Sequence, residues 1–154
     1  MIKFGSSVLG SLAIALGLLM SAPHARAVDQ TPKIHRVAIQ VDANDPKVMN
    51  LVLNNAANVA RHYSAVGEEV EIEIVAYGPG LHMLRDDTSP VKARIKSMGA
   101  SMPNLSFTAC NNTRLGMKKA EGKEIPLLSE AKVVPSGVVR LMELQEQGWS
   151  YVRP

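Results

Sequence analysis

The sequence alternates between short apolar runs and longer helical segments, and this alternation constrains its fold more than any other feature. Apolar runs rich in β-branched residues predict strands at Ile34–Val41, Val70–Tyr77, Leu105–Cys110, Lys132–Val134 and Trp149–Val152. The segments between them have helical patterns that end near Ala65, Met98, Ala120 and Gln147. Strands that alternate with helices predict an α/β fold, with a five-stranded, mostly parallel sheet and helices on both of its faces.

Turn residues mark the limits of these helices. Asp45 is a good N-cap and Pro46 fits the first helical position, so the first helix is expected to begin there. The run Gly78–Gly80 predicts a turn after the second strand, and a short helical turn is expected to follow it. For the next helix we expect Ser89 to be the N-cap and Gly99 to be the stop.

The first 27 residues have the parts of a secretory signal peptide. Lys3 supplies a positive charge, the uncharged run Val8–Met20 follows, and Ala25 and Ala27 are small residues at an A-x-A cleavage site. The uncharged run is shorter than the roughly 20 apolar residues of a membrane-spanning helix. An uncleaved anchor at Phe4–Ala22 would reach across a bilayer only if tilted. We therefore predict secretion across the inner membrane to the periplasm, with no membrane attachment after cleavage.

Cleavage of the signal peptide at residues 1–27 leaves an α/β domain at residues 28–154 with almost no net charge. The chain has 17 Lys and Arg against 14 Asp and Glu. Two basic residues, Lys3 and Arg26, leave with the signal peptide, so 15 basic residues oppose 14 acidic ones and the net charge is +1. This charge gives no broad phosphate-binding surface, and we expect no nucleic-acid partner.

The loops between strands and helices lack the patterns of common cofactor sites. The loop Asp42–Asp45 has two acids and no glycine, whereas a phosphate cradle needs glycine and free backbone amides. The GxGxxG and P-loop patterns do not occur in the sequence. The histidines His35, His62 and His82 show no ligand spacing with the one cysteine. We expect neither a cofactor nor a metal.

Cys110 is the one cysteine of the chain and its most informative candidate for chemistry. It cannot form an intrachain disulfide. It ends a predicted strand immediately before a helix, where backbone amides and the helix dipole favour an anion and therefore the reactive thiolate. The backbone or side chains of Asn112 and Thr113 are expected to donate to this anion. A buried, inert cysteine fits the same position equally well.

Ligands of open parallel sheets bind outside the carboxyl ends of the strands, and this rule selects the remaining candidates. Gly78 and Gly80 would let the backbone approach a ligand, or would simply end the strand. His82 is a candidate base or ion-pair partner for Cys110. Two further pocket candidates occupy loops at this edge of the sheet, Asn111 after the third strand and Ser136 after the fourth.

The first helix carries apolar residues on more than one stripe. Val48, Leu51 and Val52 lie on one side, and Met49 and Leu53 extend the apolar surface around the helix. A helix with so broad an apolar surface is covered on more than the side that faces its sheet. In a domain of this size the second cover is expected to be another subunit, and we predict a homo-oligomer.

Five segments together resemble the DsrE/DsrF-like family, and in particular an exported subgroup of it, over about Ile34 to Pro154. They are VAIQVD, NNAANVARHY, VAYGPGLHML, FTACNNTRLG and VVPSGVVRLMELQEQGWSYVRP. The resemblance implies a flavodoxin-like parallel sheet and trimers or hexamers. It also implies sulfur handling, because better-studied relatives carry sulfur as a cysteine persulfide and pass it between partner proteins. Cys110 is the only position here that fits this role.

Three functions are consistent with these residues and this resemblance. The first is a periplasmic sulfur carrier or sulfurtransferase that holds a persulfide on Cys110, with a sulfur donor or acceptor protein as its partner. The second is a non-enzymatic oligomeric binding module in which Cys110 is buried and inert. The third is a thiol redox sensor that forms an interchain disulfide.

Overall fold

The computed structural model describes residues 1–2 and 33–154. The predicted signal peptide at residues 1–27 therefore lies, apart from its first two residues, outside the described part of the chain. Among the described residues, no helix has both the length and the hydropathy that crossing a bilayer requires. The elements are β1 Ile34–Val41, α1 Pro46–Ala65, β2 Glu69–Ala76, η1 Gly78–Leu84, α2 Lys92–Ser101, β3 Leu105–Cys110, α3 Asn111–Glu121, β4 Ala131–Val134, α4 Gly137–Glu146 and β5 Ser150–Val152.

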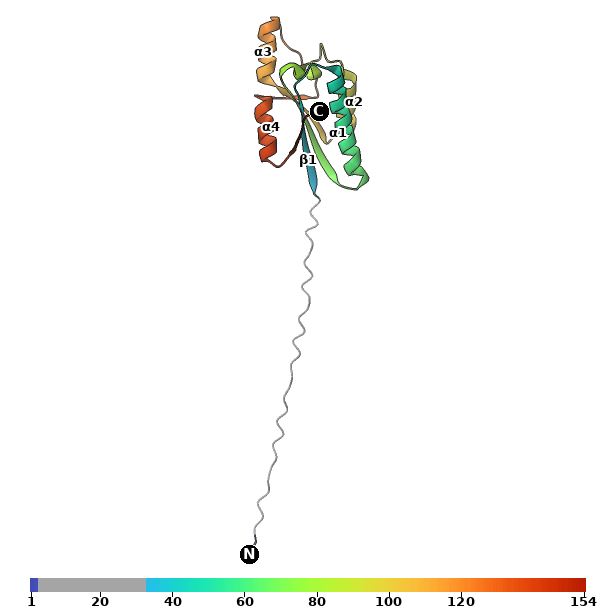
Figure 1. Cartoon of the computed structure of the whole chain (residues 1–154), viewed down its shortest axis with the longest axis vertical. Coiled ribbons are helices and arrows are strands. Elements are labelled where there is room, and N and C mark those ends of the chain that lie inside the picture. Colours follow the sequence, from blue (N-terminus) through green and yellow to red (C-terminus); the bar gives the residue numbers. More distant parts are fainter. Residues whose placement is uncertain (3–32) are drawn as a thin grey trace. The chain divides into compact units, whose positions relative to one another are not determined.

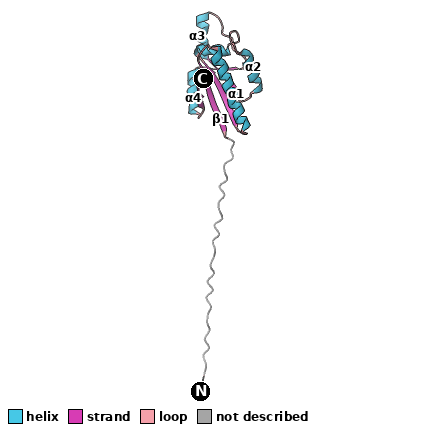
Figure 2. Cartoon of the chain, turned by 45° about the vertical axis from the view of Figure 1, so that its right-hand side comes forward, coloured by secondary structure: helices cyan, strands magenta, loops and turns pink. Residues whose placement is uncertain are grey.

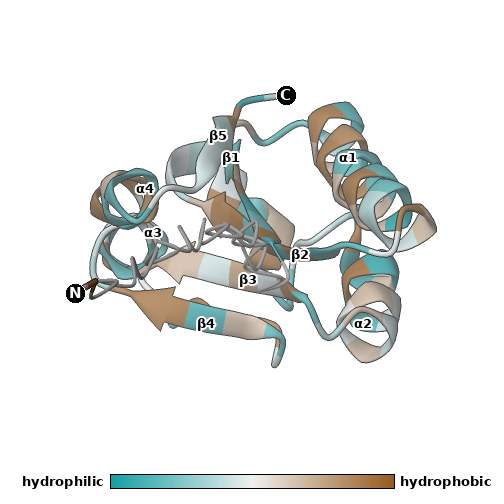
Figure 3. Ribbon diagram, turned by 90° about the horizontal axis from the view of Figure 1, so that it is seen from below, coloured by the Kyte–Doolittle hydropathy of each residue, from teal (hydrophilic) through white to brown (hydrophobic). Residues whose placement is uncertain are grey.

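The five strands form one sheet in the order β4-β3-β2-β1-β5, and every neighbouring pair is parallel. Helices α1 and α2 lie on one side of the sheet, and α3 and α4 lie on the other (Figure 3). Helix α3 lies beyond α4 along the direction of the strands (Figure 1). The predicted α/β fold is thus confirmed, and all pairs between neighbouring strands of this sheet are parallel.

The main hydrophobic core lies between the sheet and the helices α1 and α2 (Figure 2). Alternate residues of β2 point into it, as the strand period requires, and α1 contributes one apolar stripe. Burying a large aliphatic side chain stabilises the fold by about 1.5–3 kcal/mol. The largest of these buried side chains are Ile39, Met49, Leu53, Ile72, Ile74, Leu81, Met83, Leu84, Ile95 and Phe107.

A smaller core lies under α4, on the opposite face of the sheet. Leu141 and Leu144 of α4 pack against Ala38 and Val75 there, with Tyr77 and Trp149 partly buried around them. This face also buries three polar side chains, Gln40, Glu73 and Thr108. Because so few apolar contacts hold α4, polar interactions must contribute to its position.

Two sequence expectations about α2 are wrong. The helix begins at Lys92 with Val91 at the N-cap position, and Ser89 does not cap it. The Ser89 hydroxyl instead donates to the Met83 carbonyl (2.6 Å), which ties it to the preceding segment. Gly99 lies inside α2 rather than at its end, and an added Cβ there would lie 3.0 Å from the Glu130 side chain. This glycine is explained by close packing and not by helix termination.

The expected turn at Gly78–Gly80 is the start of a 3₁₀ helix. Element η1 runs without interruption from Gly78 to Leu84, so the turn and the expected helical turn after it form one element. Its residues Leu81, Met83 and Leu84 are buried in the main core. Burial of these apolar residues explains why the segment is helical rather than an open loop.

Candidate functional site

Cys110 is the last residue of β3 and the N-cap residue of α3. The strand period decides which way it points. Phe107 and Ala109 belong to the main core, so Thr108 and Cys110 face the opposite side of the sheet, the side of α4. Cys110 is 5% exposed and pairs across the sheet with Val134. The sulfur is therefore a nearly enclosed group at the carboxyl edge of the sheet.

The first residues of two helices lie next to Cys110. Helix α3 starts with the next residue, and α4 starts at Gly137, which packs directly against the Cys110 side chain. A Cβ added to Gly137 would lie 3.2 Å from the Cys110 Cβ and 3.0 Å from the Tyr77 Cβ. A side chain at this position would therefore require Tyr77, Cys110 or the start of α4 to shift. The first-turn amides of a helix have no partner within the helix and favour an anion, and here two sets of them converge on one sulfur.

Neutral donors outweigh the effect of burial on the thiol. Burial raises the pKa of Cys110, but the Thr113 hydroxyl and the backbone amides of Gly137, Thr113 and Asn112 favour the thiolate, so the net pKa lies below its ordinary value. The Asn112 amide also donates to the Pro135 carbonyl (3.1 Å). The Cys110 side chain accepts no capping hydrogen bond from the first turn of α3. The donors therefore favour the thiolate through the electrostatic attraction of their dipoles to the sulfur.

An ion pair between buried Glu73 and half-buried Arg140 holds α4 against the sheet. Arg140 of α4 donates through Nε to Glu73 Oε1 (2.8 Å) and through Nη2 to Oε2 (2.7 Å), and the Thr108 hydroxyl donates to Oε1 (2.7 Å). Burial raises the pKa of Glu73, but the bonds from Arg140 and Thr108 and the positive charge of Arg140 hold it below its usual value. A bidentate arginine–carboxylate pair fixes orientation as well as distance. It thereby fixes where the α4 amino terminus meets Cys110.

The structure brings some of the expected site residues to Cys110. The Gly78 amide donates to the Thr113 hydroxyl (2.9 Å), which joins the start of η1 to the first turn of α3, the helix that follows Cys110. Asn112 joins the start of α3 to the loop before α4 through its bond to Pro135. Asn111 is the half-buried first residue of α3.

The other expected residues act elsewhere. The pairing of His82 with Cys110 is not formed in the described part of the chain, because its Nδ1 is hydrogen-bonded to the Thr88 hydroxyl (2.9 Å). Ser136 caps α4 by accepting from the Val139 amide (3.4 Å), so it acts on the cysteine only through the helix. Gly80 packs on β1, where an added Cβ would lie 2.3 Å from the Val41 carbonyl oxygen, and this close contact within the fold explains the glycine.

Sequence reasoning missed Gly137, Glu73 and Arg140. Glu73 alternates with the apolar residues of β2 and lies on the face away from the main core, but only the fold shows that α4 covers it. The signal for Gly137 was its position immediately after Ser136, an N-cap residue type, at the start of a helix.

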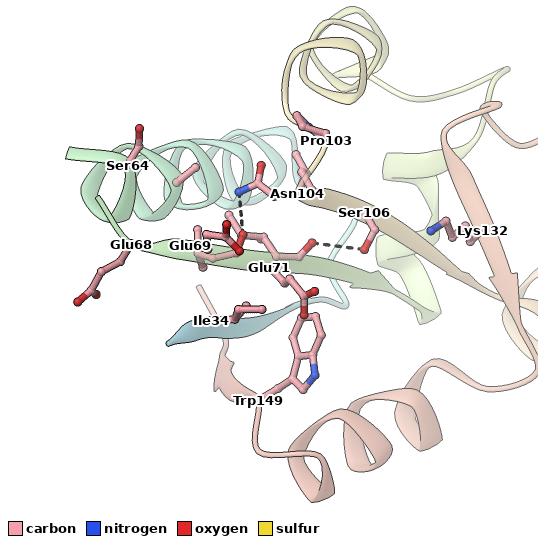
Figure 4. Close-up of a pocket in the computed structure, with 14 residues that line it drawn as sticks. Ile34, Ser64, Glu68, Glu69, Glu71, Pro103, Asn104, Ser106, Lys132 and Trp149 are labelled. Carbon is pink, nitrogen blue, oxygen red and sulfur yellow. Dashed lines mark hydrogen bonds between the residues drawn. The ribbon is translucent and has the colours of Figure 1, made fainter. Parts of the chain in front are cut away.

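A groove lies away from Cys110, at the amino ends of the strands. Its volume is about 720 Å³, and Glu69, Glu71, Ser106, Lys132 and Trp149 are among its lining residues (Figure 4). The described residues contain no group of three or more His, Cys, Asp or Glu side chains that could hold a metal ion. The chemistry of Cys110 favours the opposite edge of the sheet as the functional site.

Comparison with known proteins links the domain to one family. Residues 35–154 match the model of the DsrE/DsrF-like family. The solved structure of MTH1491, a protein of unknown function from Methanobacterium thermoautotrophicum, is 32% identical, with a TM-score of 0.66. The alignment covers 78% of this chain and 99% of that one. No curated protein matches the sequence.

The close contact of Gly137 predicts a measurable effect on the thiol. Gly137→Ala should move the α4 amide away from the sulfur, raise the thiol pKa and slow alkylation at neutral pH. The measurement is the rate of reaction with iodoacetamide as a function of pH. Gly116→Ala in α3 is the matched control, because an added Cβ there meets no atom within 4 Å. An unchanged pH profile for Gly137→Ala would show that this amide does not act on Cys110.

Proposed function

Because this chain belongs to the DsrE/DsrF-like family, which is associated with sulfur relay, we propose that it carries sulfur as a persulfide on Cys110. The observation that supports this role is the set of donors around the sulfur, which come from the starts of two helices. Such donors stabilise an anionic sulfur relative to the neutral thiol. A deprotonated persulfide is also an anion, so the same donors would favour the loaded form.

The proposed transfer is a thiol–disulfide type of exchange. The Cys110 thiolate attacks the outer sulfur of a sulfane donor R–S–SH. A bond forms between Cys110 Sγ and that sulfur, the S–S bond of the donor breaks, and its electron pair leaves with RS⁻. The product Cys–S–SH loses its proton to solvent. The persulfide then takes a proton back from solvent, and an acceptor thiolate R′–S⁻ attacks its outer sulfur. The S–S bond on Cys110 breaks, R′–S–SH forms, and the electron pair stays on Cys110 Sγ, which restores the thiolate without an external oxidant.

The low exposure of Cys110 is compatible with an inert cysteine and is unfavourable for an interchain disulfide. A residue 5% exposed is also what an inert, structural cysteine in a binding module would show. Rapid labelling of the native protein by a thiol reagent would favour the carrier, and labelling only after unfolding would favour the inert cysteine. An interchain disulfide is less favoured, because it needs Cα atoms roughly 4.4–6.8 Å apart, and α4 would have to move to allow this.

The persulfide itself is directly measurable. After incubation with inorganic polysulfide and removal of the reagent, the intact mass of the protein should increase by one sulfur atom. Cys110→Ser should show no increase, and Gly116→Ala should behave as the wild type does, because it leaves the site unchanged. An unmodified wild type, or equal modification of Cys110→Ser, would contradict the proposal.

We further propose a homo-oligomer that uses the exposed face of α4. The α1 surface is less suited to this contact than its sequence indicates, since Val48 and Val59 pack against the main core and Leu51 alone is exposed. On α4, Val138, Val139 and Met142 are all exposed. Apolar groups gathered on one helix face are typical of a protein contact. Trimers or hexamers, as in the family resemblance, remain the expected states.

Light scattering at micromolar concentration tests this assembly. The wild type should have the mass of an oligomer, and Val139→Glu should reduce it, because the substitution places a charge in the apolar contact. Leu51→Glu, on the opposite side of the sheet, is the control and should retain the wild-type mass. A monomeric wild type would exclude the oligomer, and loss of assembly in Leu51→Glu alone would move the contact to α1.

The proposed location is the periplasm, in keeping with an exported subgroup of the family. Support comes from the sequence, through the uncharged run Val8–Met20 and the small residues before Val28. Amino-terminal sequencing of the protein from the periplasmic fraction should begin at Val28. A chain that begins at Met1 and is found in the cytoplasm would exclude export.

A further inference from the structure

We propose that α3 of one copy docks into the groove at the amino ends of the strands of a second copy. Helix α3 follows the carboxyl end of β3 and lies beyond α4 along the strand direction (Figure 1), so α3 and the groove lie at opposite ends of the sheet. The contact is separate from the one proposed on α4, and it does not depend on the chemistry of Cys110. It gives an occupant to a groove that the proposed function leaves without a role.

The fold of one chain makes little use of α3. None of its residues is buried, whereas each of the other α-helices buries at least one residue. One side of α3 contacts the domain, because Met117 packs against the main core and Arg114 donates through Nε to the Ile125 carbonyl (2.9 Å). Leu115 is 53% exposed. The described part of the chain therefore leaves the side of α3 that carries Leu115 uncovered.

Leu115 lines a positively charged hollow on this helix. The hollow has a volume of about 610 Å³, and its lining contains three lysines against one glutamate, which gives it a net charge of +2. Lys118 and Lys123 each pair with a carboxylate of their own chain. Among the described residues, Lys119 forms no ion pair. The α3 surface consists of Leu115, Lys118, Lys119 and Lys123.

The groove carries the opposite charge. Its lining contains three acids, Glu68, Glu69 and Glu71, against one base, Lys132, which gives it a net charge of −2 (Figure 4). The carboxylates of Glu68 and Glu71 each pair with a side chain of β1. Within the part of the chain that the structure describes, Glu69 has no such partner. An exposed carboxylate in the groove and an exposed ammonium group on α3 are thus both available for a contact between copies.

Both surfaces also have an apolar part. In the groove it is formed by Trp149, which is partly buried, and by Ile34, which is 41% exposed. Aromatic residues are enriched at the centres of protein interfaces, and the face of an indole ring attracts cations as well as apolar groups. We therefore expect Leu115 to pack against Trp149. In the same arrangement Lys119 approaches Glu69.

The α3 that fills the groove has to come from a second copy. Because the two surfaces lie at opposite ends of one sheet, a chain cannot fill its groove with its own α3. A contact between two different surfaces is heterologous, so a docked pair still has one unused α3 surface and one unused groove. Further copies can then be added until a ring closes. The opposite charges of the two surfaces steer this association and make it weaker at high salt.

Charge reversal tests the pairing of the two surfaces. Lys119→Glu and Glu69→Lys should each raise the dissociation constant of the assembly, measured by analytical ultracentrifugation, by at least about tenfold, because like charges then face each other. The double variant Lys119→Glu/Glu69→Lys restores opposite charges and should associate as the wild type does. Lys96→Glu, which changes an exposed lysine of α2 by the same charge, is the matched control and should have no effect.

Four results of this experiment would overturn the proposal. An effect of Lys119→Glu without one of Glu69→Lys would mean that α3 docks on another surface. An effect of Glu69→Lys alone would mean that something other than α3, such as another segment of the same chain, occupies the groove. A double variant that does not recover would mean that the two residues do not face each other. The fourth result is a wild type that stays monomeric.

Cross-linking between chains tests the geometry. In a Cys110→Ser background, which removes the native thiol, a Lys119→Cys chain is mixed at low salt with an isotope-labelled Glu69→Cys chain, and a short bis-maleimide is added. The cross-linked dimers should contain one chain of each kind. A Lys96→Cys chain in place of the Lys119→Cys chain should give no mixed dimers. Dimers of Lys119→Cys chains only, or no dimers at all, would overturn the docking of α3 in the groove.

The Cys110→Ser background keeps this inference apart from the proposed function, because no persulfide can form there. Mixed dimers from a protein whose wild type forms no persulfide would retain the docking of α3 and remove the carrier role. A wild type that forms the persulfide, with no mixed dimers in the cross-linking experiment, would retain the carrier role and remove the docking.

Discussion

The convergence of two helix starts on the Cys110 sulfur is the constraint on which the rest of the structure depends. Helix α3 begins at the cysteine, and Gly137 brings the first turn of α4 against it. Two contacts maintain this convergence: the bond from the Asn112 amide to Pro135 joins the two helix starts, and the Glu73–Arg140 pair anchors α4 on the sheet. Neither contact involves Cys110 itself. Each helps to set the distance between the Cys110 sulfur and the amides of the two helix starts.

The groups that act most strongly on the thiol are neutral. They are a hydroxyl and three backbone amides, and no charged side chain is among them. Glu73 and Arg140, which form an ion pair on this face of the sheet, position α4. Fixed dipoles keep their orientation whether the sulfur is a thiolate or a persulfide, so a site of this kind would not reorganise as sulfur is loaded and removed. A cation in the same place would move with its flexible side chain.

Sequence patterns predicted the sheet well because its signals are local. The β-branched runs and the cap at Asp45 each lie within a few neighbouring residues, and the structure contains the corresponding strands and helices. The position of Cys110 at the junction of a strand and a helix followed from the same patterns. The approach of Gly137 did not, because it depends on how the β4–α4 connection returns across the sheet. Ser89 and Gly99 were misassigned because tertiary packing, and not local propensity, decides where α2 begins and ends.

Ionisation of the native Cys110 thiol tests the central claim most directly. The ultraviolet absorbance of the thiolate, measured against pH with Cys110→Ser as the blank, gives the thiol pKa without any reagent that must reach the sulfur. The account predicts a midpoint below that of an ordinary free cysteine, moving toward the ordinary value when the protein is unfolded. A native midpoint at or above the ordinary value would mean that burial outweighs the amides, and would contradict the account.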